Sequence, residues 1–163
     1  KGLNMKHLGL FMNKTFSGRL NEDRIKAIRD RWNGKLVVKG IVNEEDCEKV
    51  LRLGADGIIA SNHGGRQLDA GQTTIRTIPS LARSYGDKLT VMIDSGLRGG
   101  PDIACAMASG ARFAFLGRSF MYGVGALGRE GGDHTISMLK RQLQQVMEQL
   151  ACERVTDFPD HLV

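Results

Sequence analysis

Residues 57–66 read Gly-Ile-Ile-Ala-Ser-Asn-His-Gly-Gly-Arg, and they pass abruptly from apolar to small and polar side chains. The first four residues have the length and composition of a strand buried on both faces. The glycines and polar residues that follow are typical of a loop. In parallel α/β proteins, ligands bind beyond the carboxyl ends of such strands, so this loop is a candidate for a functional site.

Three further apolar runs extend this pattern, at residues 36–39, 90–94 and 112–117. Helical patterns precede and separate the runs, at residues 21–32, 44–53, 74–85, 101–109 and 130–152. Asn43 is a candidate cap for the second helix, and Pro79 suggests that the third begins as a turn. One helix followed by four β–α units predicts a parallel sheet with crossover helices.

Two architectures fit this order, a small doubly wound sheet and part of a (β/α)8 barrel. A complete barrel needs roughly 250 residues, so a chain of 163 residues can hold only half of one. A hydrophobic content of 41% and a charged content of 25% fit a single soluble domain over residues 1–163. No apolar run reaches the ~18 residues that a membrane span needs.

The net charge indicates which ligands the chain attracts, and the spacing of its cysteines indicates whether it binds a metal. A net charge of +5 favours phosphates and carboxylates, or an acidic membrane surface. No basic run is interleaved with aromatic residues, so we expect no nucleic-acid binding. Cys47, Cys105 and Cys152 lack metal-ligand spacing. We therefore expect no metal site and a protein of the reducing cytoplasm.

Two glycine-rich loops after the third and fourth apolar runs suggest an anion site. Ser95 and Gly96 precede Arg98, and Gly117 precedes Arg118. Small residues let backbone N–H groups approach an anion, and a helix start adds a favourable dipole. Arginine can clasp phosphate oxygens with a planar fork. The alternative is that the glycines only form tight turns and the arginines are solvated.

The remaining candidates carry the chemistry. His63 could take a proton from a substrate hydroxyl or α-carbon, and Arg66 could hold a carboxylate beside it, which indicates a 2-hydroxy or 2-amino acid. Lys39 could face an electron-rich cofactor or extend to solvent. Asp94 could bind cofactor hydroxyls or hold a neighbouring group of the protein. Asp69 is expected to order the His63 loop.

Together these motifs resemble the FMN-dependent α-hydroxy-acid oxidase and dehydrogenase family over about residues 21–152. The resemblance is carried by Lys39-Gly40, by Ser-Asn-His-Gly-Gly-Arg-Gln-Leu-Asp at 61–69, by Asp-Ser-Gly-Leu-Arg-Gly-Gly at 94–100 and by Leu-Gly-Arg-Ser at 116–119. The second stretch is the most specific of them. The Asp-Ser-Gly form is similar to that of bacterial mandelate or L-lactate dehydrogenases.

The resemblance implies the C-terminal half of a (β/α)8 barrel that binds FMN at its C-terminal rim. It implies that His63 is the catalytic base, that Arg66 binds the substrate carboxylate and that Lys39 lies near flavin N1 and O2. It assigns the other FMN contacts to Ser61, Asp94, Ser95, Gly96, Arg98, Gly117 and Arg118. The implied reaction oxidises an L-2-hydroxy acid of the lactate, mandelate or glycolate type. The electron acceptor is a quinone, a cytochrome or oxygen.

The first half of the family barrel lies outside these residues, with a tyrosine and an aspartate that the resemblance places beside the substrate and the catalytic histidine. Without that aspartate His63 lacks the group that orients it, so we expect the chain alone to be inactive or weakly active. Unpaired edge strands invite pairing, so we expect a homo-oligomer or pairing with the N-terminal half. Residues 1–20 are either a surface loop or a segment that contacts the inner membrane face peripherally.

Two other functions fit the same motifs. A type 2 isopentenyl-diphosphate isomerase-like enzyme would share the phosphate loops but would not need the pair of His63 and Arg66. A half barrel could also bind FMN or phosphate only as an inactive assembly module.

Overall fold

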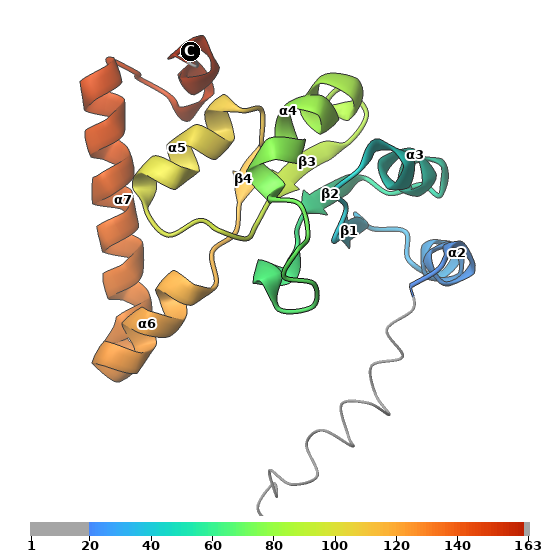
Figure 1. The fold of residues 1–163 in the computed structure, drawn as a ribbon, viewed down its shortest axis with the longest axis horizontal. Coiled ribbons are helices and arrows are strands. Elements are labelled where there is room, and N and C mark those ends of the chain that lie inside the picture. The colour runs from blue at the N-terminus through green and yellow to red at the C-terminus, as the bar shows by residue number, and fades with distance from the viewer. Residues whose placement is uncertain (1–19, 162–163) are drawn as a thin grey trace, which may run out of the picture.

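The computed structural model describes residues 20–161 as a four-stranded parallel sheet with helices packed around it (Figure 1). The strands are β1 (Val37–Lys39), β2 (Gly57–Ala60), β3 (Thr90–Ile93) and β4 (Phe113–Ala114), and they lie in the order β1-β2-β3-β4. Each neighbouring pair is parallel. The carboxyl ends of the strands therefore share one rim, as the sequence predicts.

Three crossover helices connect the strands: α3 (Glu44–Arg52), α4 (Thr74–Tyr85) and α5 (Gly100–Ala108). The helix α2 (Glu22–Arg31) precedes β1, and α6 (Arg118–Leu127) and α7 (Gly131–Leu150) follow β4. The short 3-10 turns are η2 (His63–Gly65), η3 (Gly128–Glu130) and η4 (Val155–His161). The predicted cap is confirmed, because the Asn43 side chain accepts a hydrogen bond from the backbone N–H of Asp46. In Figure 1, α2 and α3 lie near one end of the sheet and α7 lies beyond the other.

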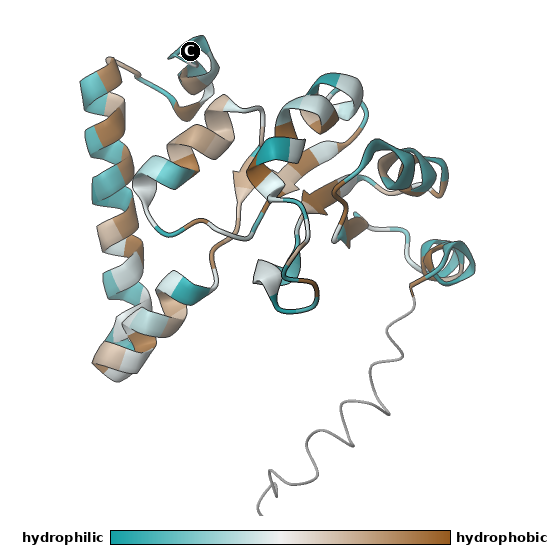
Figure 2. Cartoon of the chain, viewed as in Figure 1, coloured by the Kyte–Doolittle hydropathy of each residue, from teal (hydrophilic) through white to brown (hydrophobic). Residues whose placement is uncertain are grey.

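The main core lies between the sheet and its covering helices. Ile58 and Ile93 from the strands pack with Ile78 and Leu81 of α4, and all four are fully buried. Figure 2 shows the same division, with hydrophobic strands in the middle and hydrophilic residues on the outer helices. A second cluster consists of Ala104 of α5, Cys152 and Phe158 of η4, and it packs against apolar side chains of α7. The two central strands, β2 and β3, are largely buried, whereas Val37 of β1 is 41% and Phe113 of β4 is 55% exposed, contrary to the expectation that every strand is covered on both faces.

Pro79 does not open α4 with a turn, contrary to the sequence-based expectation. The helix runs unbroken from Thr74 to Tyr85. Its buried face, which includes Thr77, Ile78 and Leu81, packs against the sheet and the neighbouring core. Tertiary packing therefore outweighs the loss of one backbone hydrogen bond at the proline.

The segment after β3 also differs from the expectation. The fourth strand is two residues long, where residues 112–117 were expected to be extended. Within the described part of the chain it pairs only with β3, so only one side of it is held by a ladder. The ten-residue helix α6 follows, and it was not predicted. Its Gly123 and Gly125 weaken the helical pattern in the sequence.

Within residues 20–161, no helix is both long enough and apolar enough to cross a membrane. The expectation for residues 1–20, a surface loop or a membrane-contacting segment, falls outside the described residues except for Leu20.

Candidate functional site

Three strand ends meet through a lysine, a serine and an aspartate. Lys39 is the last residue of β1, Ser61 follows β2 and Asp94 follows β3. The Lys39 Nζ lies 3.0 Å from Asp94 Oδ2 and donates a hydrogen bond of 2.9 Å to Ser61 Oγ. The structure thus brings together three of the predicted cofactor-binding residues.

The pair of Lys39 and Asp94 is charged and only partly screened from water. Burial by itself would raise the pKa of Asp94, but hydrogen bonds from Ser61 and Ser95 and the Lys39 ammonium lower that pKa below its usual value. The side chain of Lys39 is 44% exposed, against 16% for Asp94. An ammonium has three N–H donors. Within the described residues Lys39 directs its donors at these two partners, so it still has donor capacity for a ligand.

The loop that carries His63 has a left-handed backbone. The φ angles of His63, Gly64 and Gly65 are 56°, 69° and 73°, a conformation that a non-glycine residue adopts only at a cost. Side-chain acceptors hold the turn in place. The His63 N–H donates to Ser61 Oγ over 3.1 Å. The Gly64 N–H donates to Asn62 Oδ1 and to Ser95 Oγ.

The imidazole of His63 lies against the end of β1. A Cβ built on Gly40 would come within 3.1 Å of His63 Cε1, and Gly40 has a φ of 101°. The side chain of His63 is otherwise exposed. Gly40 therefore leaves room for the ring next to Lys39, and the candidate base stands over the same rim as the ion pair.

Arg66 ends the same turn, and its guanidinium is exposed. Within residues 20–161 it makes no side-chain hydrogen bond, so its donors are available to an anion from solvent. Asp69 Oδ1 would lie 3.2 Å from a Cβ on Gly65, so this carboxylate borders the loop that it was expected to order.

The two predicted anion loops differ in how their helix starts are occupied. At α5, Asp102 Oδ2 accepts hydrogen bonds from the N–H groups of Arg98 (2.7 Å) and Gly99 (3.0 Å). At α6, Gly117 precedes the first turn and no side chain caps it. A Cβ on Gly117 would meet nothing within 4 Å. The start of α6 is therefore the more open of the two candidate anion sites, because no side chain occupies it.

The two arginines take different positions at these loops. Arg118 is half-buried, and its Nη2 donates to the carbonyl oxygen of Gly64 over 2.7 Å. Arg98 is exposed, and its Nη1 donates to the carbonyl oxygen of its neighbour Leu97. Ser119 Oγ joins the loops by donating to the carbonyl oxygen of Arg98 over 2.8 Å.

Ser95 and Gly96 complete the rim with positive φ angles of 73° and 86°. Ser95 Oγ donates to Asp94 Oδ1 over 2.7 Å and accepts from the Gly64 N–H over 3.0 Å. Ser95 therefore connects Asp94, whose carboxylate is predicted to contact the cofactor, with the loop that carries His63.

Sequence reasoning missed two supporting side chains. Asn62 accepts the Gly64 N–H two residues on, a local turn that an Asn before glycine could have signalled. Thr74 Oγ1 donates to the carbonyl oxygen of Asp94 over 2.8 Å. That contact spans 20 residues and has no local signal in the sequence.

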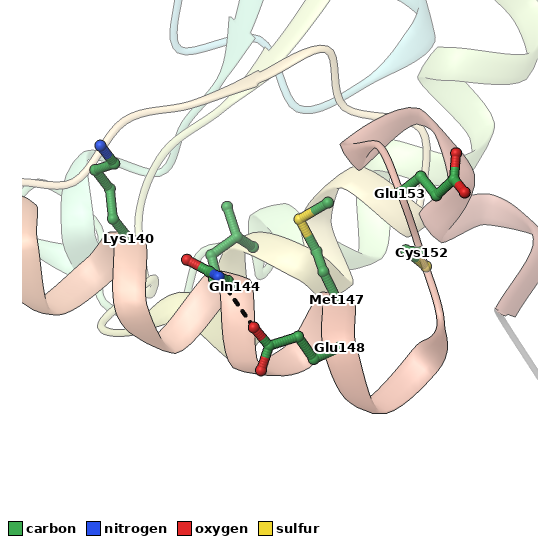
Figure 3. A pocket seen from close by; sticks show the side chains of 7 residues that line it. Lys140, Gln144, Met147, Glu148, Cys152 and Glu153 are labelled. Carbon is green, nitrogen blue, oxygen red and sulfur yellow. Dashed lines mark hydrogen bonds between the residues drawn. The ribbon is translucent and has the colours of Figure 1, made fainter.

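Figure 3 shows an open groove away from this rim, between α7 and the segment that follows it. Its lining comes from Lys140, Leu143, Gln144, Met147, Glu148, Cys152 and Glu153. Gln144 Nε2 donates a hydrogen bond of 2.9 Å to Glu148 Oε1, one turn further along α7. None of the predicted site residues lines this groove. Among residues 20–161, no three or more His, Cys, Asp or Glu side chains gather in a way that could hold a metal ion.

Known proteins share both the sequence and the fold. Residues 1–163 match the family described as FMN-dependent dehydrogenase. The chain is 34% identical over 157 residues to an L-lactate dehydrogenase of Actinobacillus pleuropneumoniae (serotype 5b, strain L20), covering 96% of this chain and 41% of that protein. It is 36% identical over 154 residues to an L-lactate dehydrogenase of Haemophilus influenzae (strain PittEE), covering 94% and 40%.

Among solved structures, mandelate oxidase with benzoyl-formic acid superimposes with a TM-score of 0.82 and 31% identity. The match covers 85% of this chain and 42% of that one. The chain thus spans about two fifths of the length of the relatives that it matches. The predicted fold class, parallel strands and crossover helices as in half of a (β/α)8 barrel, is confirmed. On both sequence and fold, the chain belongs to the FMN-dependent dehydrogenase family.

Proposed function

We propose that this chain supplies the FMN-binding rim and the catalytic base of an enzyme that oxidises an L-2-hydroxy acid to the 2-oxo acid. The single observation that carries the proposal is the convergence of Lys39, His63 and Arg118 around one rim of the parallel sheet. Relatives named L-lactate dehydrogenase and mandelate oxidase support this class of substrate.

The residues at the rim fit FMN. The uncapped start of α6, with Gly117 and Arg118, suits a phosphate, because backbone N–H groups at a helix start and a guanidinium both bind phosphate oxygens. Ser95, Gly96 and Arg98 lie in the adjoining loop, which Ser119 ties to α6. Asp94 and Ser61 would accept and donate hydrogen bonds along the ribityl chain and the flavin. FMN, when bound, supplies a two-electron acceptor.

Lys39 would hold a positive charge beside the flavin ring. Asp94 and Ser61 fix its ammonium from the protein side, so its position does not depend on the cofactor. A fixed cation in a partly shielded site stabilises negative charge that develops nearby and costs little reorganisation.

His63 would remove one proton from the substrate, from its hydroxyl or its α-carbon. The ring lies next to Gly40 at the end of β1, and from there a ring nitrogen would accept the proton of a hydroxy acid bound at the rim. Arg66, whose guanidinium has no partner among the described residues, would hold the substrate carboxylate bidentately and orient the α-carbon toward the flavin. This use of His63 and Arg66 favours a hydroxy acid over a diphosphate substrate.

Reduction of the flavin by substrate tests the proposal. The intact protein is purified, loaded with FMN and mixed anaerobically with L-lactate, L-mandelate or glycolate. We expect the flavin absorbance band to bleach with at least one of them, and reoxidation by a quinone, a cytochrome or oxygen then identifies the acceptor. A preparation that takes up no FMN would contradict the proposal and would favour an assembly module instead.

A further inference from the structure

We infer that Arg118 is a positioning residue for the His63 loop, so that occupation of the anion site at α6 also fixes the turn that carries the candidate base. The anion side of this inference rests on the proposed function. The positioning side rests on contacts within the chain alone.

The contact joins two elements that are far apart in the sequence. Arg118 Nη2 donates to the carbonyl oxygen of Gly64 over 2.7 Å, across a separation of 54 residues. A Cβ on Gly64 would come within 3.1 Å of the same nitrogen, so the guanidinium packs closely on this peptide. That carbonyl belongs to the Gly64–Gly65 peptide, which directly follows the peptide that joins His63 to Gly64, so a shift of it would alter the turn that carries the histidine.

Both peptide groups that flank the Cα of Gly64 are held by side chains. The N–H of Gly64 is held by Asn62 and Ser95, at 3.0 Å from each acceptor. On the carbonyl side of Gly64, within residues 20–161, the hydrogen-bond donor is Arg118. Because His63, a non-glycine residue, has a positive φ of 56°, the turn is costly and persists only where its surroundings hold it.

The geometry of a guanidinium allows one side chain to serve two partners. It presents five N–H donors in a rigid plane, so one nitrogen can remain on Gly64 while the others face an anion at the start of α6. An anion there would reduce the motion of the guanidinium and hence of the Gly64 carbonyl. A lysine has one compact charge on a flexible stem and cannot hold both partners in a fixed geometry.

Arg98 offers a matched comparison. Both arginines belong to the predicted anion loops, but the side chain of Arg98 donates to Leu97, its own neighbour, and is exposed. The substitution Arg98→Lys should therefore weaken anion binding at the start of α6 without releasing the His63 turn.

Amide hydrogen exchange in the intact protein tests the inference without measuring catalysis. Wild type, Arg118→Lys and Arg98→Lys are compared in peptides that cover residues 61–67, with and without inorganic phosphate or FMN. Peptides from α4 and the melting temperature report whether each variant is folded.

We expect exchange in this loop to be roughly tenfold faster in Arg118→Lys, as for the loss of one charge-assisted hydrogen bond. Exchange in Arg98→Lys should stay at the wild-type rate. Phosphate or FMN should slow exchange in wild type and have little effect in Arg118→Lys. If Arg118→Lys is unfolded, Arg118→Gln takes its place in the same comparison.

Equal exchange in the two lysine variants would overturn the positioning role. Loss of protection in Arg118→Lys together with no response of wild type to phosphate or FMN would overturn the coupling. If FMN does not bind but phosphate still protects the loop through Arg118, the proposed function fails and the inference stands. If FMN binds and is reduced by substrate while loop exchange is the same in all proteins, the inference fails and the proposed function stands.

Discussion

The ammonium of Lys39 and the carboxylate of Asp94 lie 3.0 Å apart, and this ion pair joins the carboxyl ends of β1 and β3 across the end of β2. It links a cation suited to the flavin ring with a carboxylate suited to the ribityl chain. Since both side chains are held by the protein, the rim is organised before any ligand arrives.

Replacement of Asp94 by Asn should weaken the fold as well as the site. The variant loses the negative charge that pairs with Lys39 and accepts a hydrogen bond from Ser95. We therefore expect the free energy of unfolding to fall by about 1–3 kcal/mol. Urea unfolding monitored by circular dichroism measures the change. The exposed pair of Lys26 and Asp30 is the control, with side chains 66% and 61% exposed. Asp30→Asn should change stability by less than about 0.5 kcal/mol. Equal effects of the two substitutions would contradict the assigned difference.

Acid should destabilise the protein partly through Asp56. A hydrogen bond from Lys35, then one from the Leu36 N–H, lowers the pKa of Asp56 to about 2, although burial acts in the opposite direction. Because its pKa in the folded state is below the unfolded value of about 3.9, its contribution is complete above about pH 4. It is lost as the pH falls toward about 2.

The check on Asp56 is the urea midpoint measured from pH 6 to pH 2 in wild type and in Asp56→Asn. Wild type should lose stability faster over the acid range than the variant does. Parallel curves for the two proteins would show that Asp56 does not contribute in this way.

Replacement of Gly40 by Ala should disturb the His63 ring. Gly40 has a φ of 101°, and the new methyl group would lie 3.1 Å from His63 Cε1. We expect the variant to be destabilised by at least ~1 kcal/mol and the ring-proton NMR signals of His63 to shift. Gly128→Ala is the matched control, since Gly128 also has a positive φ, of 60°, but open space around it. The control should lose stability and leave the His63 signals in place. Identical His63 ring-proton signals in Gly40→Ala and Gly128→Ala would argue against a contact between residue 40 and the His63 ring.

Thiol alkylation should distinguish the cysteines. Burial, followed by the charges of Glu48 and Glu44, raises the pKa of Cys47 to about 11, whereas Cys105 is exposed. The thiolate is the reacting species, so iodoacetamide near pH 8 should modify Cys105 first. Cys105→Ser should remove this fast phase in mass spectra of the folded protein, and persistence of the phase would contradict the assignment.

The parallel sheet and the polar ends of β1, β2 and β3 could be predicted because they depend on local patterns. An apolar run followed by small and polar residues marks a strand end in each case. The cap at Asn43 is equally local. Half of a barrel is implied by the resemblance to FMN-dependent hydroxy-acid dehydrogenases, since the element order also fits a doubly wound sheet, and the comparisons with known proteins confirm that fold.

The contacts between loops could not be predicted from the sequence. Lys39 and Asp94 pair across the end of β2, and Arg118 reaches Gly64 from 54 residues away. Such contacts depend on strand register and on the position of α6, and the two helical glycines obscured that helix. The roles assigned to individual site residues remain predictions, because they depend on ligands rather than on the fold.

The rate of flavin reduction in His63→Gln tests the central claim most directly. The intact, FMN-loaded protein is mixed anaerobically with L-lactate or L-mandelate, and the absorbance is followed in a stopped-flow instrument. His134→Gln is the control, since His134 is exposed on α7. We predict that His63→Gln retains FMN but reduces it about 10²–10⁴-fold more slowly, while the control matches wild type. Flavin reduction at the wild-type rate in His63→Gln would contradict the account.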